Sequence, residues 1–128
     1  MVWTVRIKGQ DAVALPVSDA FLLALLPRVR DPEVMLIDPY RDATLDRRAL
    51  TRWQAELARI AGELREEMAA RLAQTRRLPG DPTSREMLLH DWVERELSTD
   101  QYFQMLREVE AAVALALEGD GVIVAMGD

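Results

Sequence analysis

The sequence contains no cysteine, only one histidine (His90) and only one lysine (Lys8). A chain without cysteine forms no disulfide, offers no thiolate to a metal and has no cysteine nucleophile. One histidine excludes a metal site built on a histidine pair within a single chain. We expect His90 to be a solvated residue on the polar side of a helix, because a lone general base would still need a nucleophile and an orienting partner.

The sequence also lacks the motifs of serine catalysis and of phosphate binding. Its serines, Ser18, Ser84 and Ser98, stand at or near predicted helix starts, where capping explains them, and none lies in a G-x-S-x-G elbow. The glycines are isolated apart from a Gly119-Asp120-Gly121 turn, so no glycine-rich loop could cradle a phosphate. We therefore predict a protein that is not an enzyme, with no catalytic residues, no bound metal and no cofactor.

Long hydrophobic runs are missing too, and basic residues are outnumbered. No apolar stretch is longer than Ala20–Leu26, which is too short to span a bilayer. The formal net charge of −6 would repel nucleic acids and anionic lipid headgroups. The N-terminus alternates polar and apolar residues, unlike a signal peptide. We expect one cytoplasmic domain over residues 1–128, binding neither membrane nor nucleic acid.

What the sequence does contain is regular hydrophobic spacing of two kinds. Trp3, Val5 and Ile7 alternate with polar residues, which predicts a strand, and a second apolar run ends at Pro16. The short run VMLI and the terminal VIVAM indicate two further strands. We expect an α+β fold whose sheet has about four mainly antiparallel strands, near residues 2–8, 12–16, 34–37 and 121–126.

The middle of the chain has the spacing of amphipathic helices. One apolar stripe runs through Leu50, Trp53, Leu57, Ile60, Leu64, Met68 and Leu72. We predict helices at about 46–77, 83–97 and 99–118, and a short one after Ser18, all over one face of the sheet. We expect capping boxes at Thr83 with Glu86 and at Ser98 with Gln101, and a left-handed stop at Gly119. Gly62, inside the longest helix, weakens it by roughly 1 kcal/mol relative to alanine.

Charged residues on these helices are expected to form solvated faces. Arginines and glutamates interleave along the longest helix, and Glu67 with Arg71 has the spacing of an i,i+4 ion pair. Glu96 projects into an apolar stripe. We expect its stem to follow the edge of the core while its carboxylate reaches water or an arginine, although a buried carboxylate is the alternative.

The segment LIDPYRDATLD, residues 36–46, places three aspartates four residues apart. Such carboxylates could bind a hard cation, but the spacing is not that of an EF-hand loop. A structural reading explains each one: Asp38 ends a strand before a proline, Asp42 suits an Asx-turn, and Asp46 caps the long helix, with Leu45 and Leu50 as a hydrophobic staple. Tyr40 and Arg41 then remain without a structural role.

Two motifs resemble a known group of proteins. The motif D-P-Y-x-D-x-x-L is formed here by Asp38, Pro39, Tyr40, Asp42 and Leu45, and the chain ends in Gly127-Asp128. Together they resemble a loosely defined group of small bacterial proteins with a D-P-Y-G-D-T-like corner and a C-terminal strand ending in G-D. Some of these look like immunity proteins that neutralise a toxin. Here Arg41 replaces the usual glycine and Ala43 the usual threonine.

We therefore expect a non-enzymatic protein-interaction module, most concretely an immunity-type inhibitor of a basic toxin. Its candidate partner-binding residues are Asp38, Tyr40, Arg41 and Asp42. Two alternatives remain open. One is a structural or regulatory subunit that forms a homodimer, and the other is a small-ligand or metal-binding domain at the Asp38–Asp46 corner.

Overall fold

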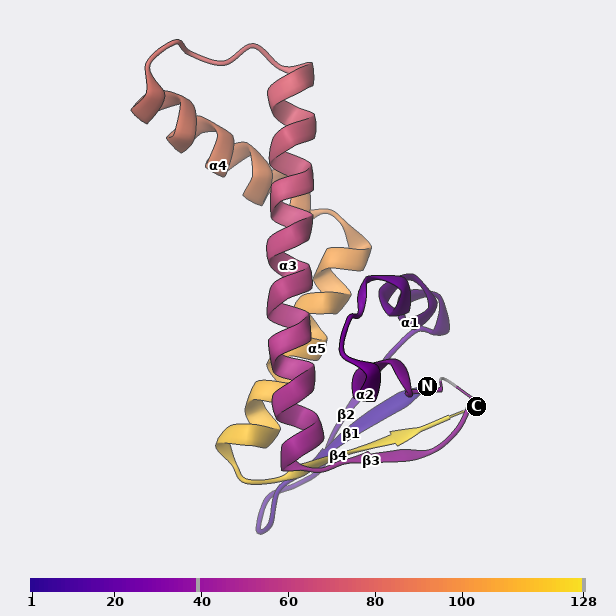
Figure 1. Ribbon diagram of the computed structural model, residues 1–128. Coiled ribbons are helices and arrows are strands. Elements are labelled where there is room, and N and C mark those ends of the chain that lie inside the picture. Colours follow the sequence, from indigo (N-terminus) through magenta and orange to yellow (C-terminus); the bar gives the residue numbers. More distant parts are fainter. Residues whose placement is uncertain (39, 128) are drawn as a thin grey trace.

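The computed structural model describes residues 1–38 and 40–127 and has an α+β architecture (Figure 1). Three of its elements lie close to the strands predicted at the two ends of the chain, and four lie close to the predicted helices, including the short one after Ser18. The elements are β1 (Val2–Arg6), β2 (Val13–Pro16), α1 (Asp19–Leu25), the 3-10 turn η1 (Leu26–Arg28), α2 (Pro32–Met35), β3 (Ala43–Leu45), α3 (Arg47–Thr75), α4 (Pro82–Ser98), α5 (Gln101–Glu118) and β4 (Val122–Met126).

The four strands form one antiparallel sheet in the order β2-β1-β4-β3. The first two strands, β1 and β2, form a hairpin, and the last strand, β4, pairs with β1. Trp3 and Val5 of β1 and Ile123 and Ala125 of β4 are buried, because alternate residues of a strand point to the same face. The described helices all lie on that face, and none of them covers the other face of the sheet (Figure 1).

The predicted strand at residues 34–37 is wrong. Residues Pro32–Met35 form the short helix α2, and the fourth strand is β3, after the aspartate segment. The Asp31 side chain accepts the N–H of Glu33 as an N-cap, and Pro32 occupies the first turn, where a proline costs no hydrogen bond. Only Val34 and Ile37 of this apolar run are buried, so it packs with the spacing of a helical turn.

The long helix α3 begins as predicted. Asp46 is its N-cap and accepts the N–H of Ala49 at 2.9 Å. Leu45 and Leu50, at the two staple positions, are both buried. Leu50, Trp53 and the rest of the predicted stripe face the core except Leu64, which is partly buried against it.

The caps of α4 and α5 differ from the predicted ones. Asp81, not Thr83, caps α4 and is followed by Pro82, and Asp100, not Ser98, caps α5. Each aspartate accepts a backbone N–H of the first turn at 2.9 Å. At the end of α5 the left-handed residue is Asp120, with φ of 52°, and Gly119 is not left-handed.

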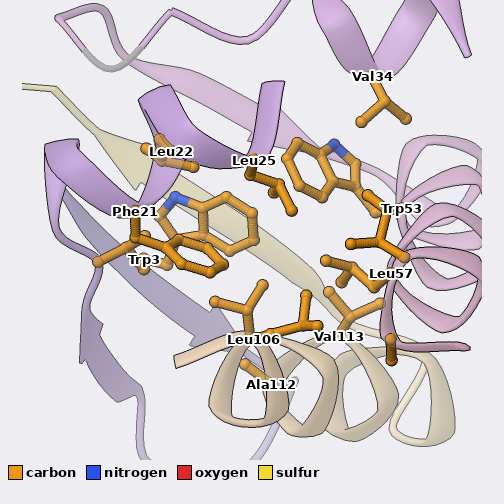
Figure 2. Packing of buried hydrophobic residues seen from close by; sticks show 14 of the residues in the cluster. Trp3, Phe21, Leu22, Leu25, Val34, Trp53, Leu57, Leu106, Ala112 and Val113 are labelled. Atoms are coloured by element: carbon orange, nitrogen blue, oxygen red, sulfur yellow. The ribbon is translucent and has the colours of Figure 1, made fainter. Parts of the chain in front are cut away.

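The core lies between the sheet and the helices. Trp3 from β1 and Trp53 from α3 meet edge to face, with ring centroids 5.1 Å apart (Figure 2). Phe21 lies beside Trp3, and Leu106 of α5 comes from the opposite side (Figure 2). Among the described residues, no polar or charged side chain is buried as a whole.

The helices extend well beyond the sheet. A 29-residue α3 is about 43 Å long, so its last turns stand far from the strands (Figure 1). We call α4 together with residues 65–75 of α3 the helical arm. Within residues 1–38 and 40–127, no helix combines the length and the hydrophobicity that crossing a membrane requires.

Candidate functional site

The turn before β3 is held by backbone and carboxylate hydrogen bonds. We call the described residues Asp38 and Tyr40–Asp42 the corner. The Asp38 carboxylate accepts the N–H of Tyr40 at 2.9 Å, and its carbonyl accepts the N–H of Arg41 at 3.1 Å. Asp42 instead accepts the N–H of Gly127 at 2.9 Å. The Asx-type bond therefore belongs to Asp38, and the role predicted for Asp42 was wrong.

The corner lies directly against the end of β4. A Cβ built on Gly127 would stand 2.4 Å from the Arg41 nitrogen and 2.5 Å from the Tyr40 carbonyl carbon, closer than real Cβ atoms come. Only glycine therefore allows this approach of the two backbones. The two motifs of the resemblance are thus neighbours in space, although Pro39 and Asp128, one from each motif, fall outside the described residues.

The four predicted partner-binding residues divide into two kinds. Asp38 and Asp42 hold the backbone, as described above. Tyr40 is 61% exposed, and the Arg41 side chain is 84% exposed, with one loose contact of 3.6 Å from its Nε to Asp38. The side chains free to meet a partner are therefore those of Tyr40 and Arg41.

Exposed apolar side chains continue from the corner into the preceding turn. Leu36 is 80% exposed and Met35 is 51% exposed, both of them in the segment that had been predicted as a strand. An exposed aliphatic side chain is ordinary by itself, but several within a few residues are more typical of a contact surface. Their exposure was not predicted from the sequence, because they were assigned to the wrong element.

A small cavity of about 180 Å³ opens beside Leu36, where α2, β3 and the start of α3 meet. Its lining residues are Glu33, Val34, Leu36, Ile37, Ala43, Leu45, Ala49, Arg52 and Trp53. The charged groups belong to an ion-pair cluster, in which Arg52 contacts Asp31 at 3.0 Å and Glu33 at 3.2 Å. The remaining lining is apolar. No local sequence pattern indicates this cavity, because three separate elements create it.

The corner has no arrangement that suggests chemistry at a bound metal or a nucleophile. Asp38, Asp42 and Asp46 each accept a different backbone N–H. In the described part of the chain, no three histidine, aspartate or glutamate side chains gather closely enough to hold a metal ion. His90 is exposed on α4, in the helical arm, and Ser18 caps α1 by accepting the N–H of Phe21.

Ion pairs account for most of the charged side chains on the helices. Glu67 pairs with Arg28 at 2.6 Å, and not with Arg71 as predicted. Glu96 is partly exposed, and its carboxylate contacts Arg76 at 2.7 Å. The prediction that this carboxylate reaches water or an arginine is therefore confirmed. These pairs are solvent-accessible and each contributes little to stability.

Two ionisable side chains of α5 are less well satisfied. The Tyr102 hydroxyl and one carboxylate oxygen of Glu110 are buried and have no hydrogen-bond partner among the described residues. Burial raises the pKa of the Glu110 carboxyl, against the opposing effect of Arg107 and Arg65. Burial likewise raises the pKa of the Tyr102 phenol. Both residues lie on α5 and neither belongs to the corner.

Comparison with known proteins provides no relative from which a function could be transferred. No protein-family model, no curated protein and no solved structure matches the chain. The function proposed below therefore rests on the residues and contacts of this chain alone.

Proposed function

We propose that the protein is a non-enzymatic protein-interaction module that contacts its partner through the corner and the adjoining turn. The observation that carries the proposal is the group of exposed side chains Leu36, Tyr40 and Met35 beside an apolar cavity. When a partner covers large apolar side chains and removes them from water, the free energy of the complex is lowered. Tyrosine and arginine, as at Tyr40 and Arg41, are the residues most enriched in interface hot spots.

The rigidity of the corner favours the same function. The turn is held by Asp38, and Asp42 ties it to Gly127 of the neighbouring strand end. A backbone that is ordered before binding loses less conformational entropy when the complex forms. The side chains of Tyr40 and Arg41 are therefore presented on a fixed support.

The charge of the protein supports a basic partner. With a formal net charge of −6, the chain would be attracted to a basic protein over long distances, which raises the association rate. An immunity-type inhibitor of a basic toxin is the most concrete form of this proposal. In that form the corner would cover a basic surface of the toxin.

Co-purification with the product of the adjacent gene tests the inhibitor. The wild-type chain should retain that protein, and Leu36→Ser and Tyr40→Ser should each weaken the retention. Leu23→Ser is the matched control, because Leu23 is 54% exposed but lies on α1. If the adjacent gene encodes nothing toxin-like and its product is not retained, the inhibitor form is wrong. If Leu23→Ser weakens retention as much as Leu36→Ser, the corner is not the contact surface.

A homodimer is the second candidate, and the uncovered face of the sheet favours it. Val2 is 40% exposed and Met126 is 48% exposed. Val2 of β1 lies between its cross-strand partners Met126 of β4 and Pro16 of β2. Four strands of this length present roughly 300 Å² by standard strand spacings, against about 800 Å² per partner in a standard interface. Such a small face ranks the dimer second, and a clean monomer by light scattering at micromolar concentration would contradict it.

A further inference from the structure

A second apolar surface lies in the helical arm, away from the corner. It is a groove of about 290 Å³ in the angle between α3 and α4. Ala69 of α3 and Leu89 and Val93 of α4 supply its apolar lining, with charged and polar side chains around them. Leu89 is only partly buried, so a part of the apolar face of α4 stays in contact with water.

The groove exists because the distal part of α3 has fewer neighbours than the proximal part. Along its length α3 packs against α5, α2 and two strands, whereas its distal turns lie beside α4 and the first turn of α5, where the Arg65 guanidinium stands 5.2 Å from the centre of the Phe103 ring (Figure 1). The N-terminal half of α4 also inclines away from α3 (Figure 1). A helix from a partner, lying between α3 and α4, would cover the apolar side chains that these two helices leave in contact with water.

The rim of the groove is acidic and largely uncompensated. Glu94 contacts Arg65 at 3.1 Å, so the guanidinium on the rim is already neutralised. Glu66 and Glu86, one on each helix, make no ion pair or hydrogen bond within residues 1–38 and 40–127. His90 is the remaining polar side chain of the lining.

The other glutamates of α3 differ from Glu66, because each of them pairs with an arginine. Glu56 and Glu63 pair with Arg59, and Glu67, which is in the helical arm but outside the groove, pairs with Arg28. The chain thus neutralises the glutamates of the same helix outside the groove and leaves two beside an apolar surface without a cation.

We propose that this groove binds an amphipathic helix of a protein partner, with basic side chains on both flanks of its apolar stripe. The wall formed by α4 runs from Glu86 to Glu94, about 12 Å along the helix axis. This length would accommodate roughly two turns of a partner helix. Apolar residues at positions i, i+4 and i+7 of the partner would contact Ala69, Leu89 and Val93. Its flanking lysines or arginines would meet Glu66 on one wall and Glu86 on the other. This site does not depend on the corner being a contact surface.

Two synthetic helix-forming peptides test the proposal. They share leucines at positions i, i+4 and i+7 and differ only in carrying lysines or glutamates on both flanks. The lysine peptide should bind the full chain about tenfold more tightly than the glutamate peptide at low salt. Its binding should shift the amide NMR signals of Ala69, Leu89 and Val93. Equal binding of the two peptides, or signals that shift only at the corner, would overturn the groove but leave the proposed function standing.

Charge reversal separates a specific rim from the general acidity of the protein. The double variant Glu66→Lys/Glu86→Lys should lose the preference for the lysine peptide by about tenfold. The control Glu108→Lys/Glu118→Lys changes the net charge equally, but on exposed positions of α5, and should keep most of the preference. An equal loss in both variants would show non-specific attraction and overturn the proposal. Circular dichroism melts of both variants establish that each is folded.

Discussion

Replacing Gly62 by alanine should make the protein more stable. Gly62 lies inside α3, and a Cβ built on it has no atom within 4 Å. Glycine in a helix interior costs about 1 kcal/mol relative to alanine, chiefly because the unfolded chain loses more backbone freedom on folding. Since no contact opposes the added methyl group, the whole of this difference should appear as a gain of about 1 kcal/mol in the free energy of unfolding.

Urea denaturation followed by circular dichroism measures this gain. With an m-value of about 2 kcal/mol/M, typical of a small domain, the midpoint should rise by about 0.5 M without a change in m. The melting temperature should rise by about 4 °C for a chain of this size. A midpoint that stays the same or falls would refute the reasoning, because it would mean that position 62 is bent or tightly packed in solution.

The same substitution at Gly127 is the matched contrast and should have the opposite sign. Its Cβ would stand 2.4 Å from the Arg41 nitrogen, against backbone that cannot move aside like a flexible side chain. The strand end must then separate from the corner, and the hydrogen bond from Gly127 to Asp42 is lost. We expect a loss of about 1–3 kcal/mol, from strain and one unsatisfied group. If Gly62→Ala and Gly127→Ala moved the urea midpoint in the same direction, the difference in packing between the two glycines would be contradicted.

Three further predictions concern single side chains. Asp46→Ala removes the N-cap of α3 and should lower the free energy of unfolding by about 1 kcal/mol in urea titrations. Trp53→Ala removes a buried indole that packs edge to face on Trp3, and should cost about 3–5 kcal/mol in the same assay. Burial raises the pKa of Glu110, so the folded protein holds this proton more tightly than the unfolded chain does, and stability is lost as pH rises from the usual carboxyl range through the raised pKa. Glu110→Gln should therefore stabilise the protein at neutral pH and lose that advantage in acid, whereas Glu108→Gln on the exposed side of α5 should do neither.

Local pattern was sufficient for the elements whose residues repeat regularly. The alternation through Trp3 and Val5 predicted β1, and the long stripe predicted α3 with its cap at Asp46. Both follow from the chain itself, because the periods of strand and helix decide which residues share a face. The helices at 83–97 and 99–118 were also correct to within a few residues of their observed bounds.

The short apolar run at residues 34–37 shows where pattern failed. Four apolar residues have no readable period, so strand and helical turn cannot be distinguished by spacing. The signal that would have decided it was the dipeptide Asp31-Pro32, which begins α2 in the same way as Asp81-Pro82 begins α4. Aspartate at the N-cap followed by proline at the first helical position indicates a helix start as well as a turn.

The corner was predictable only in part. Giving each aspartate a structural role left Tyr40 and Arg41 without one, and the side chains of both are exposed. The role of Asp42 could not be read locally, because its partner Gly127 is 85 positions away in the sequence. The exposure of Leu36 was missed for the related reason that it depends on which element the residue belongs to.

The sequence by itself determined that the chain forms an α+β fold and where its long helix begins. It also determined that no cysteine chemistry and no histidine-pair metal site can occur within one chain. These properties depend on composition and on neighbours within a few residues. The tertiary structure decided the position of the fourth strand, the contact of Gly127 with the corner, the cavity beside Leu36 and the acidic groove between α3 and α4. Each of these is created by elements far apart in the sequence, whose approach is governed by packing of the whole core and not by any local preference.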